Sequence, residues 1–458
     1  MQALTFEFIG PLVLIMIFTG LLAIPILSFQ SGQITETKLF KVQKGKVSPG
    51  SITISPDLAH FAYGTMDHKV VIDGKSFGPF NLIGPVLYSG DSKDYAFLAN
   101  LRTGEPSKII WNGVEKLTDY QVSNLFRAGE TGGLCWSELN KEFTRLIHPS
   151  GPTEWIEKVE KLYFSDDGTS FALRASEKIP VVADAQASTN APPTRDIIIR
   201  QDGSKINRDR VVQIFPAPNG LGYATLSSDN EVNYRNRSYR FKGEFYAKPL
   251  FSPDGKVFAF RNSYTGVAPS GQNIQFYQYS VGGLTVPDLQ IQTGLAFAPD
   301  GKKWVMCGLN GKSPFIYVSD SGLVPYDEFP GLNGAPPEPY KVAKFANGKI
   351  VLLFQGKSDK PILFVEDKGL FPLGEFVGLP DTLSISPDGQ NLVIGGSDMR
   401  ESRAFIVNLV SPGPATELLK PGYDLQNLGK GTFVWKSKNE VHFMILRKSE
   451  LIRVSAKI

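Results

Sequence analysis

An all-β fold made of small antiparallel sheets is predicted for this chain of 458 residues, and three observations predict it. Short apolar runs, rich in β-branched and aromatic residues, recur along most of its length, as strands require. The tetrapeptide Ser-Pro-Asp-Gly, or a variant of it, separates pairs of these runs. The copies of this tetrapeptide return at a spacing that predicts how the sheets are organised.

The tetrapeptide has the composition of a tight hairpin turn. Ser accepts a turn hydrogen bond, Pro presets φ, Asp tolerates the third position and Gly supplies a positive φ. The clearest copies are Ser55-Pro56-Asp57, Ser252-Pro253-Asp254-Gly255, Ala298-Pro299-Asp300-Gly301 and Ser386-Pro387-Asp388-Gly389. Drifted copies begin at Ser89, Ser137, Ser165, Ala217, Ala346 and Lys436. We interpret all of them as structural turns, whose aspartates (Asp166 in the copy at Ser165) bond to local backbone N–H groups rather than to a metal.

The copies begin at residues 55, 89, 137, 165, 217, 252, 298, 346, 386 and about 437, which gives a mean spacing of about 42 residues. A period in the forties with several strands per repeat is typical of β-propeller blades. Asp73-Gly74 and Asn112-Gly113 follow later strand candidates and are strong hairpin signals. We expect about ten four-stranded antiparallel blades over residues 50–458. They would form one large ring or two smaller rings, since propellers typically have about four to eight blades.

One family resembles this repeat. An apolar strand, Ser-Pro-Asp-Gly, an aromatic strand and a further strand followed by Asp73-Gly74-Lys75 resemble the repeat of the TolB-like propellers, a WD-like family. The resemblance covers roughly residues 50–455. It implies a propeller and, because these propellers are usually found outside the cytoplasmic membrane, an extracytoplasmic (periplasmic) location. It implies no particular activity, since its motif is structural.

Residues 8–29 predict one transmembrane helix, preceded by a tail of residues 1–7. This run of 22 residues carries no charge and would span about 33 Å, enough for a bilayer core of about 30 Å. An uncleaved anchor is favoured over a signal peptide, because no basic residue precedes the run and no clear cleavage site follows it. The lysines after it would by themselves place the propeller in the cytoplasm, whereas the family resemblance favours the external side.

Residues 30–49 allow two interpretations. They are polar and rich in lysine, as a stalk between the bilayer and the ring would be. Part of them, Lys38 to Val42, alternates polar and apolar residues and would suit a strand that closes the ring against the C-terminal strands.

The charge of the chain argues against a nucleic-acid partner. Its formal net charge is +3, which is too small to indicate a polyanion. The one basic aromatic stretch, Tyr234 to Lys242, shows no clean basic face if it is a single strand, so we interpret it as a solvated strand. Asn236-Arg237-Ser238 within it also matches a glycosylation acceptor.

No residue set points to catalysis. The chain has no Gly-x-Ser-x-Gly motif, and its histidines (His60, His68, His148 and His442) lack metal-ligand spacing. We interpret Cys135 and Cys307 as small buried hydrophobes. The tryptophans are expected to be buried between blades: Trp111, Trp136, Trp155, Trp304 and Trp435. We therefore expect a non-enzymatic protein with no catalytic residue, cofactor or metal.

The long loops are the candidate binding elements, because irregular loops on a rigid scaffold usually carry binding. They are residues 176–195, 262–272 and 326–341. The last loop supplies the expected partner contacts Tyr326, Asp327, Glu328, Phe329 and Tyr340. The leading hypothesis is a membrane-anchored propeller that acts as an interaction scaffold or accessory subunit for other membrane or envelope proteins. The alternative is a propeller that binds a small molecule or glycan in its central channel, with or without catalysis.

Overall fold

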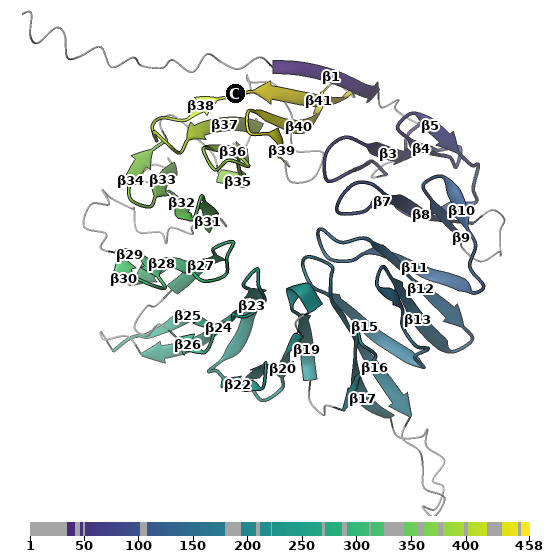
Figure 1. Ribbon diagram of the computed structural model, residues 1–458, viewed down its shortest axis with the longest axis horizontal. Helices are drawn as coiled ribbons and strands as arrows, with labels where there is room; N and C mark the ends of the chain where they lie inside the picture. Colours follow the sequence, from purple (N-terminus) through teal and green to yellow (C-terminus); the bar gives the residue numbers. More distant parts are fainter. Residues whose placement is uncertain are drawn as a thin grey trace, which may run out of the picture.

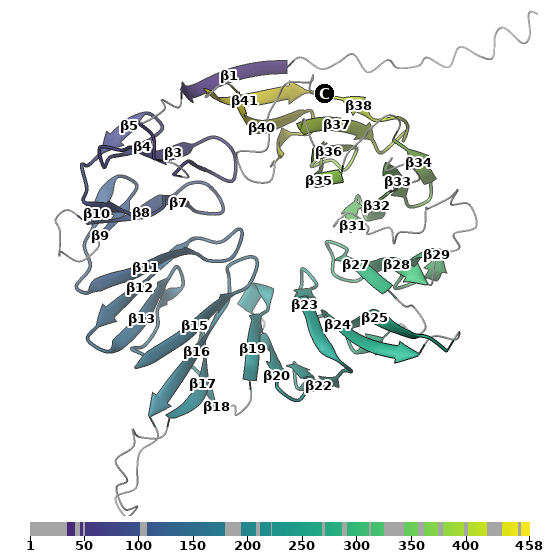
Figure 2. The ribbon, with the colours of Figure 1, turned by 180° about the vertical axis from the view of Figure 1, so that it is seen from behind.

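A ring of ten blades is the architecture of the chain. The computed structural model describes residues 34–41, 46–48, 51–100, 108–178, 194–207, 211–220, 222–267, 271–285, 291–310, 313–324, 343–355, 361–373, 379–397, 402–418, 433–447 and 450–458. Over these residues the antiparallel blades follow one another around a common centre (Figure 1). The first strand of each blade lies nearest the centre and the last lies outermost, as the view from behind also shows (Figure 2). The expectation of about ten blades is confirmed, and they form one ring.

The strands are numbered in chain order. Blade 1 contains β2 (Thr53–Ile54), β3 (Phe61–Gly64), β4 (Val70–Ile72) and β5 (Lys75–Phe77); blade 2 contains β6 (Leu82–Ile83), β7 (Leu87–Tyr88), β8 (Tyr95–Asn100), β9 (Lys108–Trp111) and β10 (Val114–Lys116). Blade 3 contains β11 (Gln121–Arg127), β12 (Leu134–Asn140), β13 (Phe143–His148) and β14 (Gly151–Pro152); blade 4 contains β15 (Lys158–Phe164), β16 (Phe171–Lys178), β17 (Thr194–Arg200) and β18 (Lys205–Asn207). Blade 5 contains β19 (Val211–Pro216), the 3₁₀ turn η1 (Pro218–Gly220), β20 (Tyr223–Ser227), β21 (Glu231–Tyr234) and β22 (Arg237–Arg240).

The second half of the ring follows the same plan. Blade 6 contains β23 (Glu244–Phe251), β24 (Phe258–Val267), β25 (Asn273–Val281) and β26 (Leu284–Thr285); blade 7 contains β27 (Ile291–Phe297), β28 (Trp304–Asn310), β29 (Ser313–Val318) and β30 (Gly322–Val324). Blade 8 contains β31 (Ala343–Ala346), β32 (Lys349–Gln355), β33 (Pro361–Val365) and β34 (Gly369–Pro372); blade 9 contains β35 (Leu379–Ile385), β36 (Asn391–Ser397), β37 (Ser402–Asn408) and β38 (Thr416–Glu417). Blade 10 contains β39 (Val434–Ser437), β40 (Glu440–Arg447), β41 (Glu450–Lys457) and β1 (Ile34–Lys41).

Blade 10 fastens the two ends of the chain together. Strand β1 pairs antiparallel with β41, from Ile34 opposite Ala456 to Lys41 opposite Glu450. An ion pair of 2.8 Å between Lys38 Nζ and Glu450 Oε2 adds to the backbone bonds. Of the two interpretations of residues 30–49, the ring-closing strand is therefore the one that residues 34–41 adopt.

Each blade buries apolar side chains against both of its neighbours. In β20, Ala224 and Leu226 pack with Phe258 and Phe260 of blade 6, whereas Tyr223 packs toward blade 4. Successive side chains of a strand point to opposite faces, so both faces of a blade are covered. This two-sided burial explains why second strands such as β28 and β32 are almost continuously apolar.

The Ser-Pro-Asp-Gly copies join the first two strands of their blades. In three of the clearest copies the Ser hydroxyl donates to the Asp carboxylate at 2.6 Å: Ser55 to Asp57, Ser252 to Asp254, and Ser386 to Asp388. Each of these carboxylates also accepts a backbone N–H two residues on. In the turn of blade 2, the hydrogen bond from Ser89 lowers the pKa of Asp91 to about 2.

Neighbouring turns are also bonded to one another. The backbone N–H of Asp57 donates to Ser92 Oγ of the next blade at 3.0 Å, and Asn219 N–H donates to Asp167 Oδ2 of the preceding blade at 3.0 Å. The Asn347 side chain donates to the Asp388 carbonyl at 2.8 Å. The turns therefore hold blades together as well as reversing the chain.

Three sequence predictions about local structure are wrong. Ser137 lies inside β12, and the first turn of blade 3 is formed by residues 128–133, which contain no Ser-Pro-Asp. In blade 4, Asp167 rather than Asp166 receives the Ser165 hydroxyl, at 2.6 Å. Residues 262–267 of the expected loop 262–272 continue strand β24.

The predicted membrane segment falls outside the described part of the chain, since residues 1–33 are not described. Within the described residues, no helix has the length and apolar character needed to cross a bilayer.

Candidate functional site

Aromatic and charged side chains gather on the outer part of blades 2 and 3. We call this group the rim cluster, and it consists of Trp111, Lys116, Tyr120, Trp136, Glu138, Arg145 and Trp155. Its members come from strands β9, β10, β12 and β13 and from the segments that precede β11 and follow β14. The cluster is therefore assembled by the packing of two adjacent blades.

Lys116 and two tryptophans form the part of the cluster between the blades. The tight turn Asn112-Gly113 brings β10 back along β9, so that Lys116 returns to the side of Trp111. Lys116 Nζ lies 4.6 Å from the centre of the Trp111 ring and 4.3 Å from that of Trp136. The two rings meet edge to face at 6.0 Å. An ammonium over two aromatic faces is held by the negative charge of the π systems.

An ion pair whose carboxylate is almost fully buried forms the centre of the cluster. Glu138 and Arg145 are cross-strand partners in the β12–β13 hairpin. Arg145 Nε donates to Glu138 Oε2 at 2.9 Å, and its Nη2 lies 2.7 Å from the same oxygen. Trp136 Nε1 donates to Glu138 Oε1 at 3.0 Å. The Glu138 side chain is only 4% exposed, so these three donors replace the water that it lost on folding.

The other side of Arg145 faces two aromatic rings. Its guanidinium lies 4.9 Å from the Tyr120 ring and 4.7 Å from the Trp155 ring. The two rings are themselves in edge-to-face contact at 4.7 Å. All three side chains are half-buried, so each keeps part of its surface open to solvent. The arrangement is rigid because every member is fixed by at least two others.

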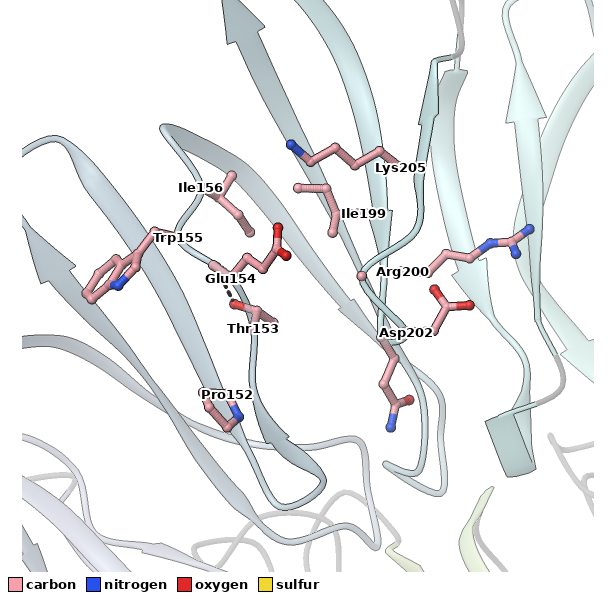
Figure 3. A pocket seen from close by; sticks show the side chains of 11 residues that line it. Pro152, Thr153, Glu154, Trp155, Ile156, Ile199, Arg200, Asp202 and Lys205 are labelled. Atoms are coloured by element: carbon pink, nitrogen blue, oxygen red, sulfur yellow. Dashed lines mark hydrogen bonds between the residues drawn. The ribbon is translucent and has the colours of Figure 1, made fainter.

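A cavity of about 210 Å³ lies beside the cluster, between the 152–156 loop of blade 3 and the β17–β18 hairpin of blade 4. Figure 3 shows Glu154 and Lys205 extending into the space between these segments, while the Trp155 ring turns away from the hairpin. Asp202 at the hairpin tip accepts from the Ser204 hydroxyl at 2.6 Å, which lowers its pKa. The cavity thus brings both acidic and basic side chains, Glu154, Asp202 and Lys205, to the edge of the cluster.

Exposed apolar side chains surround the cluster. Val114, which pairs with Trp111 across the β9–β10 hairpin, is 69% exposed, and Leu117, next to Lys116, is 90% exposed. Phe143, at the start of β13, is 44% exposed. Aromatic rings, fixed cations and open apolar side chains on one surface suit the binding of another molecule.

The residues expected from the sequence to act as a site are distributed differently. The turn residues lie in the first hairpins of the blades, as described above. The expected partner contacts Tyr326, Asp327, Glu328, Phe329 and Tyr340 lie outside the described residues. The part of the chain that the structure describes holds no group of three or more His, Cys, Asp or Glu that could ligate a metal. Cys135 and Cys307 are both buried, and burial raises the pKa of Cys135 to about 12.

The basic stretch at 234–242 is not one strand. Arg235 and Asn236 have positive φ and form the turn between β21 and β22, so the expected alternation through them is wrong. Tyr234 is 3% exposed and points into the core between blades 5 and 6. The tryptophan prediction holds for Trp136 and Trp304, which are buried, whereas Trp111, Trp155 and Trp435 are half-buried.

Sequence reasoning missed four members of the rim cluster, namely Lys116, Tyr120, Glu138 and Arg145. The interpretation of Ser137 to Asn140 as a turn concealed the β12 strand that carries Glu138. A two-residue turn at Lys141 and Glu142 places Glu138 opposite Arg145, and this pair of opposite charges was the signal available in the sequence.

Comparison with known proteins finds likenesses among solved structures only at low identity. No protein-family model matches the chain, and no curated protein matches it. Among solved structures, a eukaryotic initiation factor matches at 13% identity (TM-score 0.39; 83% of this chain and 90% of that chain), and the Dos1 propeller at 13% (TM-score 0.37; 92% and 95%). The C-terminal WD40 domain of Sif2 matches at 12% (TM-score 0.34; 92% and 98%). Enzymes, such as the dihydro-heme d1 dehydrogenase NirN, also occur among the matches. The strand pairing establishes the propeller of this chain independently of these likenesses.

Proposed function

We propose that this chain is a non-enzymatic, membrane-anchored propeller that binds another membrane or envelope protein. Residues 8–29 would hold it in the bilayer, with the propeller on the extracytoplasmic (periplasmic) side. The rim cluster is the observation that carries the proposal, and we assign the partner contact to it. The loop from Tyr326 to Tyr340 stays a predicted second contact.

The composition of the rim cluster favours a protein partner. Trp, Tyr and Arg are the residues most enriched at the points that dominate protein–protein binding energy. Here Tyr120, Arg145 and Trp155 hold one another in place, so little side-chain freedom is lost when a partner covers them. The exposed side chains of Val114 and Leu117 add apolar area that a partner would remove from water.

Substitution of Leu117 tests the assignment of the contact. Leu117→Glu places a charge at a position that is 90% exposed, so it leaves the fold intact and disfavours an apolar contact. Leu323→Glu is the matched control, because Leu323 is 55% exposed on β30, the outer strand of blade 7. We expect chemical cross-linking in native membranes to lose the partner adduct in Leu117→Glu and to keep it in Leu323→Glu. Loss in both variants, or in neither, would contradict the assignment.

The membrane anchor has its own test. The full chain should resist extraction of membranes by alkaline carbonate, and a chain lacking residues 8–29 should be released. Protease added to intact spheroplasts should digest the propeller if it lies outside the cytoplasm. Release of the full chain by carbonate would refute the anchor, and protection from protease would refute the orientation.

A second function, binding of a small molecule at the central channel, is favoured by one cavity. It has a volume of about 280 Å³ and lies where β15, β19 and β23, the inner strands of blades 4 to 6, come together. Tyr163, Phe215 and Phe251 give it an aromatic lining. Phe215→Ala should abolish ligand binding at this cavity while leaving the partner adduct of the rim cluster unchanged.

A further inference from the structure

A polar cavity separates the outer parts of blades 4 and 5. Its volume is about 450 Å³, and it is bounded by the end of β17, by β20 and by the β21–β22 hairpin. Nine residues line it: Arg200, Gly222, Tyr223, Thr225, Asn233, Tyr234, Arg235, Asn236 and Ser238. Two of them are arginines and none is acidic, which sets this cavity apart from the one beside the rim cluster.

Three polar side chains cross blade 5 in a row. Thr225 of β20 pairs with Asn233 of β21, and Asn233 pairs with Ser238 of β22, so the three share one face of the sheet. Tyr223, two residues before Thr225 and on the same face, packs with the apolar core between blades 4 and 5. The row therefore faces blade 4.

Blades 4, 6 and 7 are apolar at the position of Thr225. The third residue of the second strand is Leu173 in blade 4, Phe260 in blade 6 and Met306 in blade 7, and each belongs to a hydrophobic core. Thr225 is equally buried, at 3% exposure. Burial of a hydroxyl in place of a large apolar group weakens packing, so stability alone does not explain the row.

One cation, Arg200, stands at the end of this row, because the Arg235 guanidinium lies 5.7 Å from the Tyr234 ring, which packs toward blade 6. The Arg200 guanidinium stacks 4.5 Å from the Tyr223 ring, and its Nη2 donates to Tyr223 OH at 2.8 Å. Arg200 Nε is buried and has no hydrogen-bond partner among the described residues. Figure 3 shows the Arg200 side chain extending away from Glu154 and Lys205. Within the described chain, no carboxylate oxygen lies within 4.0 Å of Arg200 or Arg235.

The nearby carboxylates are occupied by other groups. Asp202 accepts from the Ser204 backbone N–H at 2.9 Å and from its hydroxyl at 2.6 Å. Glu231 pairs with Arg240 at 3.4 Å and accepts from Ser238 and Asn233, which lowers its pKa. Glu231 thus supplies an acceptor at one end of the row, while Arg200, which interacts with Asp202 only at longer range, supplies positive charge at the other.

We propose that this cavity binds a small acidic sugar, with its carboxylate or phosphate group at Arg200 and its hydroxyls along the row of Thr225, Asn233 and Ser238. A guanidinium group binds such anions through paired, charge-assisted hydrogen bonds. A volume of about 450 Å³ falls within the usual range of about 300–1,000 Å³ for small-molecule sites and exceeds what a bare phosphate fills. The mixed donors and acceptors beyond Arg200 match the hydroxyls of a sugar.

Calorimetric titration of the full chain in mild detergent tests the proposal. The ligands are glucuronate and glucose 6-phosphate, with glucose and inorganic phosphate as controls. At least one acidic sugar should bind ten-fold or more tightly than either control, and the tighter of the two identifies the anionic group. Arg200→Gln and Thr225→Val should each weaken that binding about ten-fold, since each removes a hydrogen bond to the ligand.

Arg240→Gln is the matched control, because Arg240 is exposed on the β21–β22 hairpin but does not line the cavity. It should leave the affinity within two-fold of the wild type. Three outcomes would overturn the proposal: binding of inorganic phosphate as tight as that of both sugars, equal weakening by Arg240→Gln and Arg200→Gln, or no binding by a folded wild-type chain at millimolar ligand. None of these measurements depends on the partner contact of the rim cluster, which Leu117→Glu tests separately.

Discussion

Removal of Arg145 from the rim cluster should destabilise the propeller through the charge that it leaves behind. In Arg145→Met, Glu138 loses the two donors at 2.9 and 2.7 Å and keeps only Trp136 Nε1 at 3.0 Å. Breaking a buried ion pair typically costs about 3–5 kcal/mol. Arg145 is 25% exposed, so water can reach part of the space that it leaves, and we expect the lower end of that range. The lost contacts with the Tyr120 and Trp155 rings add about 0.5–1 kcal/mol each. The methionine side chain recovers part of that packing, so we expect the free energy of unfolding to fall by about 3–4 kcal/mol.

The double variant Glu138→Gln/Arg145→Met separates two causes of the lost stability, the unpaired charge of Glu138 and the lost packing of Arg145. The introduced glutamine side chain can still accept from Trp136 Nε1 and carries no charge to desolvate, so the double variant should be about 2 kcal/mol more stable than Arg145→Met alone. Urea unfolding, followed by tryptophan fluorescence and by circular dichroism, gives the three free energies when both probes report one transition. A loss below about 1 kcal/mol in Arg145→Met, or a double variant no more stable than the single one, would refute this account of the cluster.

Three further predictions concern the scaffold. Burial lowers the pKa of His148 from its ordinary 6.5, so the unfolded chain binds a proton more readily; stability should fall as the pH drops below about 6.5, and His148→Gln should flatten that part of a melting-temperature profile. A side chain at Gly168 (φ 68°) would place Cβ 2.0 Å from a carbonyl oxygen of blade 3, so Gly168→Ala should cost more than about 3 kcal/mol in urea unfolding. Gly203→Ala, at φ 78° with open space around it, should cost only about 1–2 kcal/mol, and equal losses would contradict the steric argument. Deletion of residues 34–41 should lower the melting temperature and cause concentration-dependent association through the free edge of β41, which light scattering would detect; an unchanged, monomeric ring would argue against closure by β1.

The blades could be predicted because their hairpins are encoded locally. Asp73-Gly74 and Asn112-Gly113 adopt the positive φ pairs that such dipeptides favour, and β4–β5 and β9–β10 follow from them. The turn at 128–133 was missed because it closes without Ser-Pro-Asp: the Ala128 N–H donates to the Gly133 carbonyl, and Gly129, at φ 65°, takes the position that Pro has in the clear copies. The number of rings could not be predicted, because it depends on how adjacent blades pack and not on any one repeat.

The rim cluster was only partly accessible to sequence reasoning. Glu138 and Arg145 face each other across one hairpin, so a correct prediction of strand β12 would have placed them opposite each other. Lys116 reaches Trp136 only because blade 2 packs on blade 3, and Tyr120 reaches Trp155 only because the chain returns to the outside after β14. Contacts of this second kind join separate repeats or distant parts of one blade, and no periodicity in the sequence encodes them.

The hydrogen bonding of the molecule separates its scaffold from its binding surfaces. In the blade turns, the oxygens of Asp57, Asp167 and Asp388 accept from their own serines and from neighbouring N–H groups. A group whose bonds are already made gains little from a new partner. At the rim cluster and the blade 4–5 cavity, by contrast, half-buried aromatic rings and an Arg200 Nε without a hydrogen-bond partner among the described residues remain. Variants of the turns should therefore change the stability of the ring, whereas variants of exposed positions such as Leu117 should change binding and leave stability unchanged.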